Sequence, residues 1–255
     1  MDIKIIVAVH KKYWLPKETC YYPVQVGHAA AQVSLGIPGD DTGANISLKN
    51  PHYCELTGLY WAWKNLQADY IGLCHYRRYF GHVGPFVSLE GKKQCLLKDR
   101  DYAQLLQDCD CLVPFKRHYY IETARSQYEH AHQKKDLDLL EQVVEELYPA
   151  YSSTFKEVMK KKSLHIANMF VMKRTLLDAY CTFLFRILFE VESRIDISGY
   201  SPMEARVFGY LSERLLDVWL IKNKIAYKEV PIVFLEKINW LKKGSKFIIR
   251  KFKGT

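Results

Sequence analysis

Two adjacent arginines and a histidine stand in the motif HYRRYF at residues 75–80, directly after the apolar run 70–74. A short apolar run is typical of a buried strand, so the motif falls at a strand end. Guanidinium groups bind phosphate oxygens through paired N–H donors, and histidine donates to phosphate, accepts a proton or ligates a metal. We therefore predict an anion site at His75, Tyr76, Arg77 and Arg78. The alternative is a surface pair of arginines that bridges to acidic neighbours.

A second group of polar residues lies on the glycine-containing loop GDDTGANIS at 39–47. Asp40, Asp41 and Asn45 supply carboxylate and amide groups that can bind a nucleobase or a ribose diol. The same residue types are also the usual formers of turns, so the loop alone leaves both interpretations open. The sequence argues against a calcium loop, because the alternating acidic pattern and the closing glutamate are absent.

Candidate acid–base residues lie further along the chain. Arg206 and Glu213 are seven residues apart, which places them on one flank of a helix expected over 202–222. A carboxylate beside a cavity can serve as a general base, and the alternative is a surface ion pair or a capping role. Asp136 lies in a polar helical segment. His165 and Asn168 bracket a strand expected over 166–172.

The elements that must position these residues alternate along the chain. We expect strands over 3–9, 70–74, 111–114, 166–172 and 227–234, and helices over 51–66, 175–193 and 202–222. This alternation predicts an α/β fold with a mostly parallel sheet. Val9, His10 and Lys11 end the first strand, at the edge of the sheet where ligands bind in such folds. We expect residues 1–236 to form one domain, with a helical insertion at about 118–162 placed over the strand ends.

Composition narrows the functional class. The seven cysteines are odd in number and contain no CxxC pair, which indicates neither a disulfide framework nor a zinc site and fits a reducing cytoplasm. Neither a signal peptide nor a membrane-length apolar run is evident. The motifs GxGxxG, GxxxxGK[ST] and GxSxG are also missing, which argues against dinucleotide, P-loop and α/β-hydrolase enzymes.

The net charge of +9 is concentrated at one end of the chain. Residues 237–255 contain seven basic and no acidic side chains, which leaves 30 basic and 28 acidic residues in the remainder. Apolar residues interleave with these cations, as in segments that bind anionic lipid headgroups. We expect a basic amphipathic tail and peripheral association with the cytoplasmic face of the membrane; a solvated terminal helix is the alternative. A nucleic-acid partner is disfavoured, because the rest of the chain is almost neutral.

Six blocks together resemble a known family: VAVHKKYW (7–14), GDDTGANIS (39–47), NPHYCELTGLYWAWKN (50–65), DYIGLCHYRRYF (69–80), HIANMFVMKR (165–174) and RVFGYLSERLLDVWL (206–220). This bacterial family was first catalogued as a domain of unknown function. Its members occur among capsular-polysaccharide, exopolysaccharide and O-antigen glycosyltransferases, including galactofuranosyltransferases. The resemblance covers residues 3 to 236 and implies a GT-A-like fold, a Rossmann-type sheet that binds a nucleotide sugar.

The resemblance also implies roles for the candidate residues. The donor nucleotide and diphosphate would contact Val9, His10, Lys11, Asp40, Asp41, Asn45, His75, Tyr76, Arg77 and Arg78. His165, Asn168 and Arg206 would contact the acceptor or the donor sugar, and Glu213 would be the catalytic base, with Asp136 as the second choice. The HYR of the motif stands where such folds carry an Asp-x-Asp metal motif. We therefore expect arginine and histidine to neutralise the diphosphate with little need for metal; a Mn²⁺ or Mg²⁺ ion on His75 stays open.

The implied function is transfer of a hexose from a UDP-sugar to a lipid-linked oligosaccharide, in the synthesis of capsule, exopolysaccharide or O-antigen. A galactofuranosyl donor implies an inverting reaction with a single base; a UDP-pyranose is the other donor to consider. The main alternative is a non-catalytic, membrane-associated module that binds polysaccharide or another polyanion. A sugar-phosphate transferase would share the arginines but leave phosphate on the product. Whether Glu55 contacts the ligand or holds the preceding loop is not decided by the sequence.

Overall fold

A computed structural model describes residues 1–84 and 88–236; the basic tail predicted at 237–255 lies outside these residues. The main sheet has eight strands. They are β1 (Ile3–Val9), β2 (Tyr21–Gln25), β3 (Tyr70–His75), β4 (Arg78–Phe80), β5 (Cys111–Pro114), β8 (Phe170–Lys173), β9 (Lys228–Val230) and β10 (Ile232–Phe234).

Strand pairing gives the order β2-β1-β3-β8-β5-β9, and β4 and β10 extend the sheet beyond the end of β3. Only β4 and β8 run against the other strands of this sheet, so the sheet is mostly parallel as the sequence predicts. The α/β fold class is therefore confirmed.

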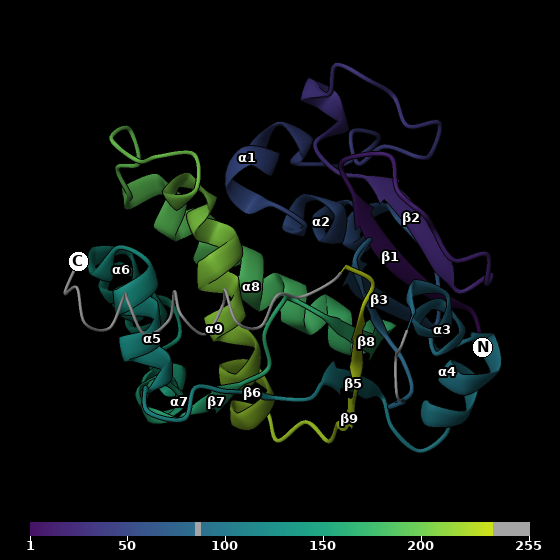
Figure 1. Cartoon of the computed structure of the whole chain (residues 1–255). Helices are drawn as coiled ribbons and strands as arrows, with labels where there is room; N and C mark the ends of the chain where they lie inside the picture. Colours follow the sequence, from purple (N-terminus) through teal and green to yellow (C-terminus); the bar gives the residue numbers. More distant parts are fainter. Residues whose placement is uncertain (85–87, 237–255) are drawn as a thin grey trace.

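Helices cover both faces of the sheet (Figure 1). One face packs on α2 (Leu56–Asn65), α8 (Arg174–Arg194) and α9 (Val207–Lys222), and the other lies under α3 (Leu89–Gln94) and α4 (Asp99–Leu105). Along β1, Ile6 and Ala8 belong to the first core and Ile5 and Val7 to the second, as a period of two requires. Burial on both faces explains why this strand is apolar throughout. Each buried Ile or Val contributes roughly 1.5–3 kcal/mol of hydrophobic stabilisation.

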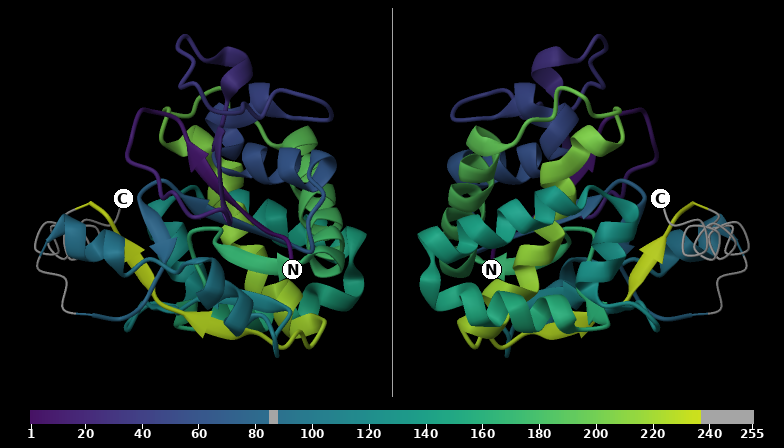
Figure 2. Two further views of the ribbon diagram at one scale, coloured as in Figure 1. Left: turned by 90° about the vertical axis from the view of Figure 1, so that its right-hand side faces the viewer. Right: turned by 90° about the vertical axis from the view of Figure 1, so that its left-hand side faces the viewer.

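The segment expected as an insertion forms α5 (Ala124–Ala131), α6 (Lys134–Leu147) and α7 (Ser152–Lys160), with the 3₁₀ turn η3 (Pro149–Tyr151) between the last two. A two-stranded ribbon, β6 (Arg117–His118) with β7 (Ser163–Leu164), closes its base. The right-hand view of Figure 2 faces these teal helices, with α9 in yellow-green among them. Their apolar faces join the same core as α8 and α9, so the segment is continuous with the rest of the fold.

Several predicted elements are corrected by the structure. The helix expected over 51–66 is two helices, α1 (Asn50–Tyr53) and α2, because Cys54 has φ 54° and ψ −131° and breaks the run. The strand expected over 166–172 begins only at Phe170, since Ala167 and Asn168 take positive φ values of 74° and 50°.

Pro231, which lacks an N–H donor, divides the last predicted strand into β9 and β10. The helix expected over 202–222 starts as the 3₁₀ turn η4 (Glu204–Arg206) before α9. Two further short turns are η1 (His28–Ala30) and η2 (Ser47–Lys49). Within the described ranges, no helix combines the length and apolar character needed to cross a bilayer.

Candidate functional site

The carboxyl ends of β1 and β3 lie side by side, because Ala8 pairs with His75 in the parallel ladder. His10 therefore reaches the HYRRYF motif, although 65 positions separate it from His75 in the sequence. The two imidazole rings are 6.1 Å apart, and the His10 ring lies 5.1 Å from the buried ring of Tyr76. Lys11 Nζ and Arg77 Cζ lie 5.6 and 5.0 Å from the centre of the same ring. Tyr76 thus packs beneath a group of cationic side chains.

Positive charge is crowded at this sheet edge. Burial, followed by the charges of Arg78 and Arg77, lowers the pKa of His75 to about 3. Burial also lowers the pKa of His10, and the neighbouring charges of Arg77, Lys11 and Arg206 add to the effect. Both histidines are therefore neutral near pH 7. A bound anion would favour protonation of both imidazole rings.

Some polar groups at this edge lack a partner. The buried atoms His75 Nδ1 and Arg77 Nε make no hydrogen bond within the part of the chain that the structure describes. Buried polar atoms without a partner are rare, and one explanation is a bound ligand. Arg77 Nη1 binds the Glu236 carboxylate at 3.0 Å, so the bridging expected as the alternative is present at this one arginine. Among the described residues, Arg78 forms no such ion pair.

A carboxylate pair borders the cations. Ala167 N–H donates to Glu213 Oε1 at 2.9 Å, and Asn168 Nδ2 donates to Glu55 Oε1 at 2.9 Å. Ser212 Oγ donates to Asn168 Oδ1, which fixes the orientation of the amide. Burial raises the pKa of Glu213; the Arg214 charge opposes this and the Glu55 charge adds to it. Glu213 is thus a carboxylate in a fixed orientation whose proton affinity is above its usual range.

The two halves form one site, because their charges act on each other. The Arg78 charge lowers the pKa of Glu213, and the Arg206 charge lowers those of His10 and His75. Arg206 Nε also donates to Cys54 Sγ at 3.1 Å, which joins the start of α9 to the bend between α1 and α2. We call the group His10, Lys11, Glu55, His75, Arg77, Arg78, Asn168, Arg206 and Glu213 the edge cluster.

Backbone strain is concentrated around the edge cluster. Cys54, Ala167 and Asn168 all have positive φ values, which side-chain-bearing residues rarely adopt. Asn50 Nδ2 donates to the Cys54 carbonyl, and Gly209 leaves room for Cys54, since a Cβ there would lie 3.2 Å from its Sγ. Strained conformations persist where the surroundings impose them, and they occur frequently at functional sites.

Comparison with known proteins gives the chain a family. Residues 4–224 match the model of the domain of unknown function DUF4422. The chain therefore belongs to the DUF4422 family. It is also similar to the apo structure of WbbM, described as a bifunctional glycosyltransferase, with 33% identity and a TM-score of 0.85. The match covers 93% of this chain and 46% of the WbbM chain, so this chain spans less than half of that protein. No curated protein matches.

The WbbM likeness confirms the predicted GT-A-like, mostly parallel α/β architecture for this DUF4422 chain. The identity of 33% over nearly the whole chain also supports the coarse resemblance to glycosyltransferases. The narrower resemblance to polysaccharide and galactofuranosyl enzymes stays a prediction.

Three other residues of this DUF4422 chain that were predicted to contact the donor nucleotide form hydrogen bonds that stabilise the loop at 39–47. The buried Asp40 carboxylate accepts from Gly27 N–H and His28 N–H, both at 3.0 Å, and from Ser47 Oγ at 2.5 Å. Asn45 Nδ2 donates to the carbonyls of Asp41 and Gly43. Asp41 is partly exposed and accepts from His28 Nδ1 at 2.9 Å. Of the three predicted residues, only Asp41 turns a carboxylate toward solvent.

Three further predicted residues lie among internal partners. Val9 is buried, and its carbonyl accepts from Val26 N–H at 2.9 Å. The buried His165 ring lies between Asp217 Oδ1 and Glu229 Oε1, at 2.7 and 2.9 Å. Asp136 is buried with Tyr200 OH donating to it at 2.6 Å, and burial raises its pKa. The structure does not bring His165 or Asp136 into the edge cluster, and their predicted roles stay predictions.

The cluster is a poor setting for a divalent cation. No group of three or more potential ligand residues suited to a metal occurs among residues 1–84 and 88–236. The charges that act on His75 at neutral pH are those of Arg77, Arg78 and Arg206, and their positive charge would repel a metal ion.

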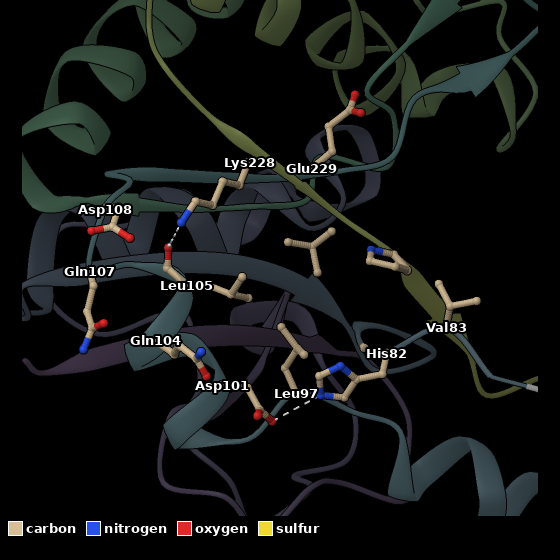
Figure 3. A pocket seen from close by; sticks show the side chains of 13 residues that line it. His82, Val83, Leu97, Asp101, Gln104, Leu105, Gln107, Asp108, Lys228 and Glu229 are labelled. Atoms are coloured by element: carbon tan, nitrogen blue, oxygen red, sulfur yellow. Dashed lines mark hydrogen bonds and ion pairs between the residues drawn. The ribbon is translucent and has the colours of Figure 1, made fainter.

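A separate groove of about 470 Å³ lies on the α4 face, between α4, residues 81–83 and the β9–β10 segment (Figure 3). His82 and Asp101 approach to 3.6 Å across it, and Lys228 Nζ donates to the Leu105 carbonyl. The groove contains none of the residues predicted from the sequence to be functional.

One residue of the edge cluster and one residue beside it lack a functional assignment from the sequence. Glu55 was visible only as an acidic residue beside a helix, and its link to Asn168 depends on packing between distant segments. Nothing in the sequence indicated a role for Cys54, because its contact with Arg206 depends on an unexpected backbone bend.

Proposed function

We propose that this chain is a glycosyltransferase whose edge cluster binds the diphosphate of a nucleotide-sugar donor and deprotonates the acceptor. The main support is the edge cluster itself, where cations with unpaired donors lie next to a carboxylate of raised pKa. The family match and the likeness to WbbM add support from comparison.

The cationic half suits the leaving group. Breaking a glycosidic bond to a nucleoside diphosphate places negative charge on the diphosphate, and fixed cations stabilise that charge in the transition state. Arg77 Nε and His75 Nδ1 have no hydrogen-bond partner among the described residues; both atoms are buried, so an anion reaches them only when neighbouring side chains move. The Glu236 carboxylate on Arg77 shows that an anion fits at this guanidinium.

The acidic half suits the base. Glu213 is oriented by the amide of Ala167, and its raised pKa increases its ability to take a proton from a sugar hydroxyl. One base is sufficient for an inverting displacement at the anomeric carbon. We assign this role to Glu213; Asp136, the second choice from the sequence, is bound to Tyr200.

The finer assignments belong to the same proposal. We propose UDP as the nucleotide, a hexose such as galactofuranose as the donor sugar, and a lipid-linked oligosaccharide as the acceptor. Capsule, exopolysaccharide or O-antigen synthesis would take place at the cytoplasmic face of the membrane, with the chain attached through its basic tail. The support for these details is the sequence resemblance and the seven basic residues of the tail.

Calorimetric titration with UDP, in the presence and absence of Mn²⁺, tests the proposal, with GDP, CMP and NAD⁺ as controls. We expect selective UDP binding that Glu213→Gln retains and Arg77→Ala weakens. Glu213→Gln should also abolish transfer of radiolabelled sugar from the UDP-sugar. UDP binding that requires Mn²⁺ would keep the transferase and contradict the metal-poor site. Absence of any nucleotide binding would refute the proposal and favour the polyanion-binding module.

A further inference from the structure

A second surface, separate from the edge cluster, combines exposed apolar side chains with cations that form no ion pair among the described residues. It is built from residues 115–121 and 160–162, which we call the ribbon surface. The strands β6 and β7 pair Arg117 with Leu164 and His118 with Ser163. Tyr119 N–H donates to the Lys162 carbonyl at 2.8 Å, and Ala124 N–H to that of Lys161 at 2.7 Å. Figure 1 shows the ribbon at the lower edge of the molecule, between α7 and β9.

The underside of the ribbon is anchored in the core. Tyr119 and Leu164 are buried, and Arg214 Nη1 donates to the Tyr119 hydroxyl at 3.1 Å. On the outer side, the exposed fraction is 52% for Phe115, 81% for Tyr120 and 58% for Ile121. The fold thus fixes the ribbon rigidly and leaves three large apolar side chains in solvent.

The turn that presents the central ring is strained. Tyr120 has φ 60°, and Ile121 N–H donates to the Tyr119 carbonyl at 2.7 Å, which makes a three-residue turn around Tyr120. A side-chain-bearing residue adopts this conformation only where the surroundings impose it. The strained turn holds the aromatic ring outward instead of folding it onto the protein.

The cations around these apolar tips are uncompensated. Arg117, Lys160, Lys161 and Lys162 are exposed, and within the described part of the chain none of them forms an ion pair. No acidic residue occurs in 115–121 or 160–164. Nearby acids are directed elsewhere: Glu122 is buried against His130, and Glu229 binds His165. Glu157, one turn before Lys160 on α7, is the neighbouring exposed acid, and the surface remains strongly positive.

We propose that the ribbon surface docks on a lipid bilayer that contains anionic headgroups. Lysine and arginine are attracted to the negative headgroups, while aromatic and aliphatic tips enter the interfacial layer. A nucleic acid would also attract the cations, but Ile121 has no ring face on which a base could stack. This docking is independent of the transferase proposal and of the basic tail, which is the same in every variant below.

Vesicle flotation of the full chain tests the surface. Vesicles of phosphatidylcholine with phosphatidylglycerol are compared with vesicles of phosphatidylcholine alone. Each lysine near an anionic bilayer changes the partition coefficient about fivefold. We therefore expect Lys160→Gln/Lys161→Gln/Lys162→Gln to lower binding to the anionic vesicles roughly a hundredfold.

The matched control, Lys17→Gln/Lys98→Gln/Arg100→Gln, removes the same charge from the α4 side of the molecule. It should change binding by less than about threefold, because exposed charges farther from the bilayer than the Debye length are screened. An equal loss in the control and in the ribbon variant would overturn the proposal, since total charge or the tail would then explain binding. An unchanged melting temperature in the ribbon variant shows that it is folded, and this control holds whether or not the chain binds UDP.

Two further measurements test whether the apolar side chains insert into the bilayer, and whether the ribbon surface binds RNA instead of a membrane. Phe115→Ser/Ile121→Ser should weaken vesicle binding although it keeps every charge. Tyr120→Trp should add fluorescence that brominated phosphatidylglycerol quenches. An added tryptophan that is not quenched, or tighter binding to single-stranded RNA than to anionic vesicles with the same dependence on Lys160–Lys162, would refute the membrane assignment.

Discussion

Replacement of Arg78 by methionine isolates the contribution of one cation to donor binding. Arg78 lies at the start of β4, and its charge is the largest electrostatic influence that lowers the pKa of His75. Because it forms no ion pair among the described residues, its removal leaves no protein carboxylate without a partner. Arg77 is a less suitable target, since its loss also releases Glu236.

The expected loss of UDP affinity follows from the type of contact. A hydrogen bond to a charged group contributes about 1.5–3 kcal/mol, which corresponds to a dissociation constant about 10 to 150 times higher. Arg78 is partly exposed, so solvent screening favours the lower part of this range. The thermal stability of the free protein should be unchanged or higher, because Arg78→Met removes one of several cations that repel each other.

Titration calorimetry with UDP and thermal unfolding of the same samples measure both quantities, with Lys98→Met as a control on an exposed lysine of the α4 face. Weaker UDP binding with an unchanged or raised melting temperature supports the diphosphate site. Weaker binding with a lowered melting temperature would instead indicate structural damage. Unchanged UDP affinity in Arg78→Met would refute the reasoning that this motif binds the donor.

Three other predictions concern the acidic half and the loop. Glu213→Gln should bind UDP as the native protein does but lower kcat by about 10² to 10⁴, as loss of a general base does. Because burial raises the native pKa of Glu213 above its unfolded value, ionisation of Glu213 reduces stability. The melting temperature of the Gln variant should therefore exceed the native one at neutral pH, and the difference should shrink as pH falls through the native pKa toward the unfolded value. Asp40→Ala should lower the free energy of unfolding by about 2–4 kcal/mol in a urea titration, because three donors lose their buried acceptor; a change below the error of the titration would contradict this. Asn168→Ala should be about 1 kcal/mol less stable than Asn168→Gly, since φ is 50° and alanine is strained there; equal stability would show that the turn relaxes.

The central strands could be predicted because their burial requires apolar residues, which are visible in the sequence. β1 and β5 match the expected ranges 3–9 and 111–114, since strands covered on both faces read as apolar runs. The strand β2 was not predicted, because its sequence is not a continuous apolar run. It contains Pro23 and partly exposed residues, and it is stabilised mainly by its pairing with β1.

The cationic half of the site could be predicted from the topology of the expected parallel sheet, and the acidic half could not. Parallel strands end at the same edge, so His10 and His75 could be expected to meet once both strands were recognised. Glu55, Asn168 and Glu213 come from three segments whose meeting depends on the bend at Cys54 and on the left-handed turn at Asn168. Tertiary contacts impose such conformations, so the hydrophobic periodicity of the sequence does not predict them.

Three departures from ordinary stability rules coincide at the edge cluster. Burial and the crowded cations keep both histidines neutral, polar atoms on His75 and Arg77 have no partner among the described residues, and positive φ values occur at Cys54 and Asn168. Each departure costs free energy, and folding alone gives no reason to place all of them at one edge of the sheet. A diphosphate would relieve the first two at once, because it would pair with the cations and accept from the unpaired donors. The strained turns at Ala167 and Asn168 hold the carboxylates of Glu213 and Glu55 through hydrogen bonds, and among the described residues neither carboxylate forms an ion pair with these cations. Under the proposed function, the site would remain positive until a donor binds, and Glu213 would be the base next to the donor sugar.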